Sequence, residues 1–272
     1  MKKYQKQSGM TVDAEYGEEQ GNPFFEALPE ILGKEEVMKR LRSQIPYPKD
    51  IQKRSPEERR REVMEISKWF YPMDYMYTIY DMLYRAMSAT YQTKNIVDHI
   101  RQMNDLYMDF RTGREREFQY ATQAYTGAVL GVPGIGKTST VQRCLSLMPQ
   151  VIVHKNYGGK PMYTKQINYL FVECPSDCSV RTLAFNIFSA IDRAIGSDYL
   201  KQATYQRAVA ASATTTKLKI ICMNHHIGLI VIDEIQNAIQ TAVKNRQLKP
   251  LVKFLVELTN ETSTGICFCG TM

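Results

Sequence analysis

The most informative segment of the sequence is Gly131-Val132-Pro133-Gly134-Ile135-Gly136-Lys137-Thr138-Ser139. It fits the phosphate-loop pattern GxxxxGK[ST], follows a predicted apolar strand and opens a predicted helix at Lys137. Glycines let backbone N–H groups converge on a phosphate, and the helix N-terminus adds partial positive charge. We therefore expect residues 131–139 to bind ATP. Lys137 would contact the β- and γ-phosphates, and the Thr138 hydroxyl would bind Mg²⁺.

A second motif, Gly228-Leu229-Ile230-Val231-Ile232-Asp233-Glu234, lies about ninety residues further on. Four apolar residues that run into two acids predict a buried strand with carboxylates at its C-terminal edge, where open α/β sheets bind ligands. We expect Asp233 to hold magnesium through its water shell. Glu234 would act as the catalytic group that polarises the water attacking the γ-phosphate. The alternative is a strand that ends in two solvated acids.

The Asp-Glu pair favours hydrolysis over phosphoryl transfer, because a small-molecule kinase places its acceptor where this glutamate would place water. The next apolar strand, near 266–269, ends in Gly270-Thr271. A polar residue at that point commonly hydrogen-bonds the γ-phosphate or the attacking water. Thr271 is therefore a candidate sensor, or simply a threonine at a strand end.

Residues 121–272 have the texture of an α/β protein. Short apolar runs near 128–130, 151–153, 169–172, 229–232 and 266–269 alternate with helices predicted from 137, near 180–194, 202–217 and 248–258. Unalternated apolar strands separated by helices predict a parallel sheet that is buried on both faces and flanked by helices. Residues 154–165, which include Gly158-Gly159, read as a hairpin-like insertion.

Residues 1–120 are not expected to share this alternation of strands and helices. Residues 1–21 are polar and read as a flexible tail, and residues 22–120 read as a mainly helical N-terminal region. Prolines bound the segment 22–29 and predict an extended conformation. Ser55-Pro56-Glu57-Glu58 predicts a capped helix start. Two apolar stripes follow and are expected to lie in the core: Val63, Ile66, Trp69 and Phe70, then Met76, Ile79, Tyr80, Leu83, Tyr84 and Met87.

Composition bounds these expectations. The 272 residues, 44% hydrophobic and 23% charged, suit one or two globular domains. The sequence shows no membrane span and no secretory signal, so we expect a cytoplasmic chain with no membrane partner. The net charge of +7 permits a polyanionic partner. The six cysteines and four histidines lack zinc-site spacing, so reduced, mostly buried thiols are expected.

GVPGIGKTS, LIVIDEIQNA and CFCGTM together resemble the AAA+ ATPases, and more narrowly the TnsC/TniB-like regulators of DNA transposition. Two stretches carry the narrower resemblance. Residues 22–29 are similar to the family's "NP..EALP" segment, and residues 166–179 are similar to its "Q..YL..(D/E)CP.D.S" strand and turn. The resemblance runs from about residue 22 to the end of the chain.

The resemblance implies an ATPase that assembles with itself, as a ring or filament, on double-stranded DNA. It implies that the protein links a target-selection protein to the transposase subunits, and that hydrolysis disassembles it. It also points to Arg181, Lys201 and Arg207 as DNA phosphate contacts, although each could instead belong to a solvated helix face.

AAA+ modules continue beyond the sensor strand into a helical lid, whereas this sequence stops at Met272. We therefore expect a piece of a longer protein, without the lid, that hydrolyses ATP weakly. Two other functions stay open. One is a nucleotide-dependent protein scaffold that binds no DNA, and the other is a phosphotransferase of the P-loop kinase kind.

Overall fold

The computed structural model describes residues 9–16, 21–44, 48–92, 104–105, 107–108, 111–112, 124–177, 179–205, 211–236 and 248–271. Within these residues the main sheet is parallel and has the strand order β2-β7-β6-β5. Its strands are β2 (Thr126–Gly131), β5 (Tyr169–Glu173), β6 (Leu229–Asp233) and β7 (Gly265–Thr271). The α/β architecture with a parallel sheet and flanking helices, predicted from the sequence, is confirmed.

The strand that carries the candidate sensor lies in the middle of this sheet. β7 pairs in parallel with β2 on one side and with β6 on the other. β2, which leads into the phosphate loop, and β6, which ends in Asp233, are therefore both neighbours of β7. All four strands point the same way, so their carboxyl ends meet at one edge of the sheet.

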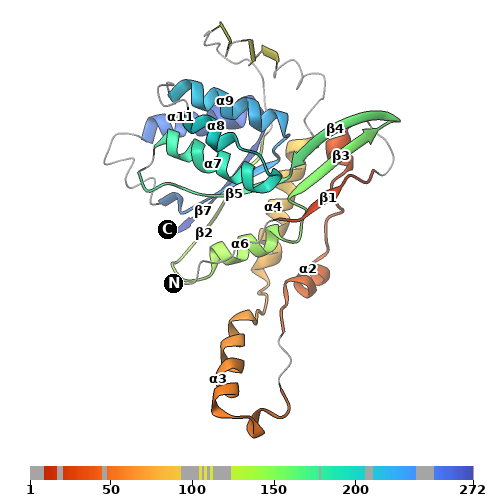
Figure 1. Cartoon of the computed structure of the whole chain (residues 1–272), viewed down its shortest axis with the longest axis vertical. Coiled ribbons are helices and arrows are strands. Elements are labelled where there is room, and N and C mark those ends of the chain that lie inside the picture. The colour runs from red at the N-terminus through yellow and green to blue at the C-terminus, as the bar shows by residue number, and fades with distance from the viewer. Residues whose placement is uncertain are drawn as a thin grey trace.

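Helices cover both faces of the sheet (Figure 1). On one face lie α4 (Tyr75–Gln92) and α6 (Lys137–Leu145); on the other lie α7 (Val180–Ile195), α8 (Tyr199–Tyr205), α9 (Ala211–Asn224) and α11 (Leu248–Thr262). β6 shows why its sequence is apolar throughout. Leu229 and Val231 pack with α4 and α6, while Ile230 and Ile232 pack with the opposite layer. Each buried side chain removes apolar surface from water.

A second, smaller sheet has the order β1-β3-β4 and is formed by β1 (Thr11–Asp13), β3 (Val151–Tyr157) and β4 (Lys160–Ile167). β3 and β4 form the predicted hairpin, which turns at Gly158 and Gly159, both with positive φ. The prediction that 151–153 belong to the parallel sheet is wrong, because β3 pairs with β4 and β1 instead.

The first described residues also differ from the sequence-based expectation. Thr11–Asp13, assigned above to a flexible tail, form a strand that pairs in parallel with β3, and Ala14 N–H donates to Val153 O at 2.9 Å. This pairing depends on the hairpin, which local sequence does not reveal. The segment after Gly21 is not extended, since α1 (Pro23–Glu26) is a short helix. Asn22 caps it by accepting the Phe25 N–H, and a proline suits the first helical turn.

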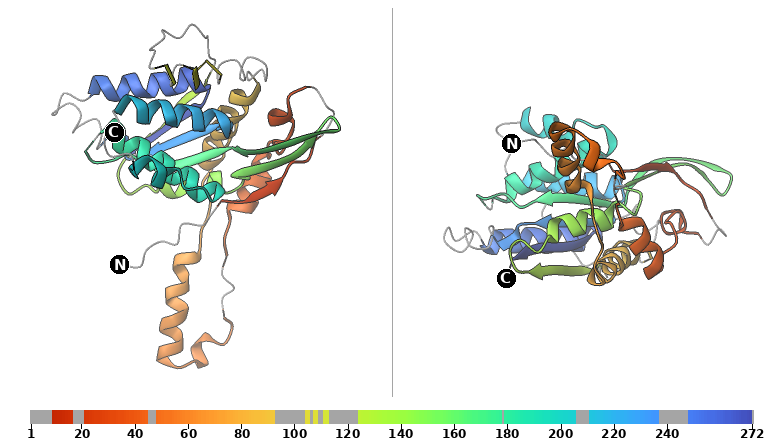
Figure 2. Two further views of the ribbon diagram at one scale, coloured as in Figure 1. Left: turned by 45° about the horizontal axis from the view of Figure 1, so that its top comes forward. Right: turned by 90° about the horizontal axis from the view of Figure 1, so that it is seen from below.

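A projecting arm follows α2 (Lys34–Leu41) and contains η1 (Ile51–Lys53), α3 (Pro56–Glu65) and η2 (Ile66–Lys68). Figures 1 and 2 show α3 extending away from both sheets. The predicted capping box is present, with Ser55 Oγ accepting from Glu58 N–H and Glu58 accepting from Ser55 N–H.

The two apolar stripes that the sequence predicts to be core differ in their burial. The second is confirmed as core, with Met76, Tyr80, Leu83 and Met87 buried on α4. The first is wrong for three of its members, which are exposed: Val63 by 62%, Ile66 by 63% and Trp69 by 53%. Helical periodicity identifies an apolar face but not whether anything packs against it, and the arm lies away from the sheets.

A buried polar network ties the N-terminal segment to the hairpin. His154 is buried between the Tyr16 hydroxyl (2.6 Å from Nδ1) and Gln166 Oε1 (2.8 Å from Nε2). Gln166 Nε2 donates to Phe24 O at 3.0 Å and to Asn168 Oδ1 at 2.9 Å. Burial lowers the pKa of His154, so the neutral ring is favoured.

Most of 93–123, part of the region expected to be mainly helical, lies outside the described residues. Of the helices that are described, none has both the length and the hydropathy that crossing a bilayer requires. The five described cysteines are buried thiols outside any disulfide, as predicted; Cys178 lies outside the described residues.

A buried ion cluster between α9 and α11 yields a stability prediction. Lys219 Nζ lies 2.9 Å from Glu261 Oε1 and 2.9 Å from Glu257 Oε2, and the Lys219 and Glu261 side chains are 7% and 6% exposed. Burial raises the pKa of Glu261, and the Lys219 ammonium opposes that rise. Lys219→Met should lower the free energy of unfolding by about 3 kcal/mol, because it leaves a buried carboxylate unpaired.

Urea unfolding measures this change. The matched control Lys253→Met, which removes an exposed partner of Glu257, should cost about 0.5 kcal/mol or less. Adding Glu261→Leu to Lys219→Met should recover much of the loss. A Lys219→Met protein as stable as the control would contradict the assigned role of the cluster.

Candidate nucleotide-binding site

The phosphate loop leaves β2 at Gly131 and enters α6 at Lys137. Gly134 and Gly136 have φ of 81° and 86°, in the left-handed region that a Cβ disfavours. Alternation of left- and right-handed residues turns successive backbone N–H groups toward one side and makes an anion-binding concavity at the start of a helix. The backbone of residues 131–139 therefore fits a polyphosphate.

Lys137 lies over this loop. Its Nζ donates to Gly131 O at 3.0 Å and to Val132 O at 2.9 Å. A Cβ on Gly131 would come 3.5 Å from Lys137 Cδ, an ordinary van der Waals contact. The ammonium is thus held at the mouth of the loop by backbone carbonyls, which a phosphate oxygen can replace as its partner.

Thr138 and Asp233, predicted as the magnesium ligands, are in direct contact. Thr138 Oγ1 donates to Asp233 Oδ2 at 2.7 Å, although the two residues are 95 positions apart. Asp233 is 3% exposed, and its Oδ1 accepts the Glu234 N–H at 2.9 Å. A hydroxyl and a carboxylate beside a phosphate loop are the hard oxygen ligands that Mg²⁺ prefers, so these residues fit that ion.

Glu234 and Thr271 are brought together through a third residue. Glu234 is exposed and has φ of 59°, a conformation uncommon for a residue with a Cβ. Gln236 Nε2 donates to Glu234 Oε2 at 2.6 Å. Gln236 Oε1 accepts the Thr271 N–H at 3.0 Å. The acid and the end of β7 are thus joined by one side-chain amide.

Sequence reasoning missed Gln236 and Cys269. Gln236 lies two residues after Glu234. Its polar side chain so close to the Asp-Glu pair is the feature of the sequence that could have indicated a role at the site. Cys269 is buried on β7, and burial, followed by the charge of Asp233, raises its pKa to about 12. The thiol therefore stays protonated beside the Asp233 carboxylate.

A family model described as the AAA domain matches residues 120–272, more than half of the chain. The chain belongs to the AAA domain family. Membership indicates nucleotide hydrolysis in general, and AAA domains with a phosphate loop typically use ATP with Mg²⁺. No curated protein matches the chain.

Two of the candidate DNA contacts lie on α7 and α8. Arg181 lies in the first turn of α7, where its guanidinium carbon is 5.4 Å from the centre of the Phe185 ring. Lys201 lies on α8, with Nζ 5.9 Å from the centre of the Tyr205 ring. Each stacks within its own helix. Arg207 lies outside the described residues.

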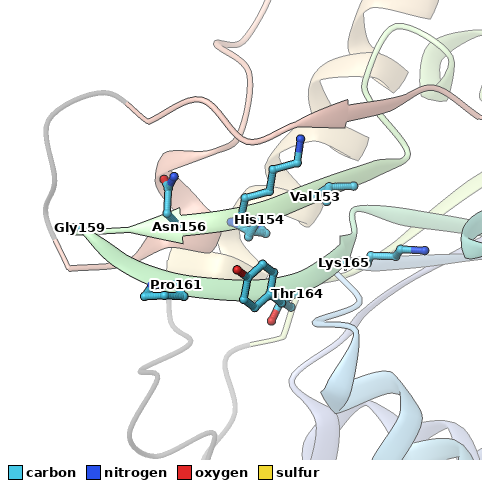
Figure 3. A pocket seen from close by; sticks show the side chains of 9 residues that line it. Val153, His154, Asn156, Gly159, Pro161, Thr164 and Lys165 are labelled. Atoms are coloured by element: carbon cyan, nitrogen blue, oxygen red, sulfur yellow. The ribbon is translucent and has the colours of Figure 1, made fainter.

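A surface hollow lies on the β3–β4 hairpin, outside the nucleotide site of the AAA domain (Figure 3). It is lined by Val153, His154, Lys155, Asn156, Gly159, Pro161, Tyr163, Thr164 and Lys165. None of these is an acid, and His154 is engaged by Tyr16 and Gln166. Nor do three or more His, Cys, Asp or Glu side chains form a metal-binding group anywhere in the described ranges.

Lys137→Ala tests the nucleotide site of the AAA domain. Loss of the Lys137 ammonium, which lies over the loop, should weaken ATP binding about 100-fold or more, because a charge-assisted phosphate contact disappears. Titration with a fluorescent ATP analogue measures the Kd. Lys160→Ala, at the tip of the hairpin, is the matched control and should bind normally. Equal affinity of the two variants would contradict the site.

Proposed function

We propose that this AAA domain protein hydrolyses ATP and uses the ATP-bound form to assemble on double-stranded DNA as a regulator of transposition. The hydrolytic part rests on one observation, the 2.7 Å contact between Thr138 and Asp233 with Glu234 next in the chain. It brings a phosphate loop, a pair of metal-ligand oxygens and a further carboxylate to one edge of the sheet.

Each side chain then has a distinct part in hydrolysis. Lys137 neutralises charge on the β- and γ-phosphates. Thr138 and Asp233 would hold the magnesium ion, which would supply further positive charge to the phosphates. Glu234 accepts a proton from the water that attacks the γ-phosphate, and Thr271 senses that phosphate. The exposure of Glu234 suits access by water, whereas the buried Asp233 is suited to a fixed ligand role.

Contacts between the two sequence stretches that resemble TnsC/TniB-like proteins support the narrower assignment. Phe24 O, in the first stretch, accepts from Gln166 Nε2, at the start of the second. Glu26 Oε1 accepts from the Tyr157 hydroxyl on the adjoining hairpin at 2.8 Å. Because residues 22–29 and 166–179 contact each other, each stretch helps to hold the other in position.

The turn of the second stretch supports the same assignment. Asp177 accepts from Ser179 N–H at 3.1 Å and from the Thr182 hydroxyl at 2.8 Å, so it fixes the start of α7. Cys174 N–H donates to Asp233 O at 2.9 Å and ties this turn to the end of β6. This contact joins the end of β6 to the turn that precedes the helix carrying Arg181.

The partners we propose are double-stranded DNA, further copies of this chain in a ring or filament, the transposase subunits and a target-selection protein. The net charge of +7 supports a polyanionic partner. In this function Arg181, Lys201 and Arg207 contact DNA phosphates with little sequence preference.

Glu234→Gln tests the hydrolytic role. The amide cannot accept the proton of water, so phosphate release should fall about 100-fold while ATP still binds. The ATP-bound assembly should be trapped, and DNA binding should be retained or strengthened. Single-turnover phosphate release and gel-shift titrations measure both properties. Normal hydrolysis by Glu234→Gln would show that another group activates water.

The proposed DNA assembly is tested by salt and nucleotide dependence. Binding to a labelled duplex should require ATP and weaken about tenfold or more between 50 and 200 mM salt, because phosphate contacts release counterions. Arg181→Ala and Lys201→Ala should each flatten the salt dependence, and Lys160→Ala serves as the control. Fluorescence anisotropy measures the affinities. Duplex binding that ignores ATP and salt would refute the assembly model.

A second candidate function is a nucleotide-dependent protein scaffold that binds no DNA. The exposed apolar residues of the projecting arm, among them Val63, Ile66 and Trp69, favour it because such surfaces often bind proteins. The same anisotropy experiment separates the two functions, since the scaffold predicts no duplex binding with or without ATP.

A further inference from the structure

The Gln236 side chain makes two hydrogen bonds that connect two parts of the nucleotide site. Its Nε2 donates to Glu234 Oε2 at 2.6 Å, and its Oε1 accepts from Thr271 N–H at 3.0 Å. Glu234 follows β6, whereas Thr271 ends β7. A primary amide donates through its NH₂ group and accepts through its oxygen at the same time, whereas an ionised carboxylate can only accept.

The surroundings of the amide are shaped to admit it. A Cβ on Gly270 would come 2.4 Å from Gln236 Oε1 and 3.0 Å from Ile235 Cγ2. The first of these distances is shorter than any real Cβ contact, so the amide could not stay in place next to any other residue type at 270. The fit of glycine to glutamine is an observation independent of the two hydrogen bonds.

Glu234 needs such support. Its carboxylate is exposed, and the backbone has the left-handed φ of 59°. An exposed side chain loses rotamer freedom only if a partner fixes it, and a carboxylate that activates water must be oriented to about the precision of a hydrogen bond. The bond from Gln236 Nε2 to Oε2 fixes the direction of this carboxylate.

We propose that Gln236 is a positioning residue for ATP hydrolysis: its amide orients the Glu234 carboxylate and ties that orientation to the end of β7. This proposal rests on the hydrolytic function proposed above. Gln236 acts through Glu234, and the backbone of Thr271, whose side chain is the candidate sensor, fixes the other end of the amide.

Two substitutions at 236 separate this role from a merely structural one. Gln236→Ala removes both hydrogen bonds, whereas Gln236→Glu keeps the acceptor for Thr271 N–H but puts a second carboxylate against Glu234. Both should lower single-turnover kcat about tenfold while the Kd for ATP stays within about twofold. The Glu variant should be at least as impaired as the Ala variant. A structural role predicts the reverse order, because Glu preserves the shape.

Coupling to Glu234 is tested in a double-mutant cycle. Adding Gln236→Ala to Glu234→Gln should cause no further loss, since the group it positions no longer works as a base. Gly270→Ala should reproduce the loss by displacing the amide. Gly127→Ala is the matched strand control, because its Cβ would meet Met82 Sδ at an ordinary 3.4 Å.

A spectroscopic readout decides the proposal even where turnover is slow. In ¹⁵N-glutamine-labelled protein, the side-chain NH₂ signals of Gln236 are those missing from Gln236→Ala. They should move when Glu234→Gln removes the charged acceptor, and should stay in place in Glu173→Gln, a control at the exposed end of β5.

The outcomes are distinguishable. If Glu234→Gln hydrolyses ATP normally, the hydrolytic function proposed for Glu234 is wrong, and the positioning role falls with it. If Glu234→Gln is inactive but Gln236→Ala turns over like the wild type, only the positioning role is overturned. Unmoved Gln236 signals in Glu234→Gln would overturn it as well.

Discussion

The hydrogen bond from the Thr138 hydroxyl to the Asp233 carboxylate links two parts of the sheet edge that are not adjacent. Thr138 lies in the first turn of α6, which follows β2, Asp233 ends β6, and β7 lies between β2 and β6. The contact exists because all three strands are parallel and end at the same edge. The phosphate loop and the acids can face one nucleotide only while β7 keeps both neighbours in register, so the site depends on the order of the sheet.

The site shares its core with the N-terminal elements. The core layer that contains α4 and α6 also contains Phe24, Val37 and Leu41, which precede the sheet by about a hundred residues. The Tyr91 hydroxyl on α4 lies 3.1 Å from Ile167 O and 2.8 Å from His226 O, and a Cβ on Gly228 would come within 2.7 Å of it. The helix that follows the projecting arm, α4, is therefore packed directly against β6, the strand that ends in Asp233.

Sequence was sufficient where the information is local or periodic. The glycine spacing of the phosphate loop, the apolar run into Asp233 and the stripe from Met76 to Met87 each identify an element and its buried face. The sequence did not predict the structure of a segment where that structure depends on residues far away in the chain. The β1 strand needs the hairpin beside it, and the exposure of Trp69 depends on the arm lying away from the sheets.

Gln236 is the clearest case of this limit. Its position two residues after Glu234 is visible in the sequence, but its second partner, Thr271, becomes a neighbour only once β7 lies beside β6. Adjacent acids thereby acquire different surroundings. Asp233 is buried and accepts from a hydroxyl and a backbone amide, whereas Glu234 is exposed and accepts from the Gln236 side-chain amide. Carboxylates in unlike environments can take different roles, so the buried acid suits a metal and the exposed one suits water.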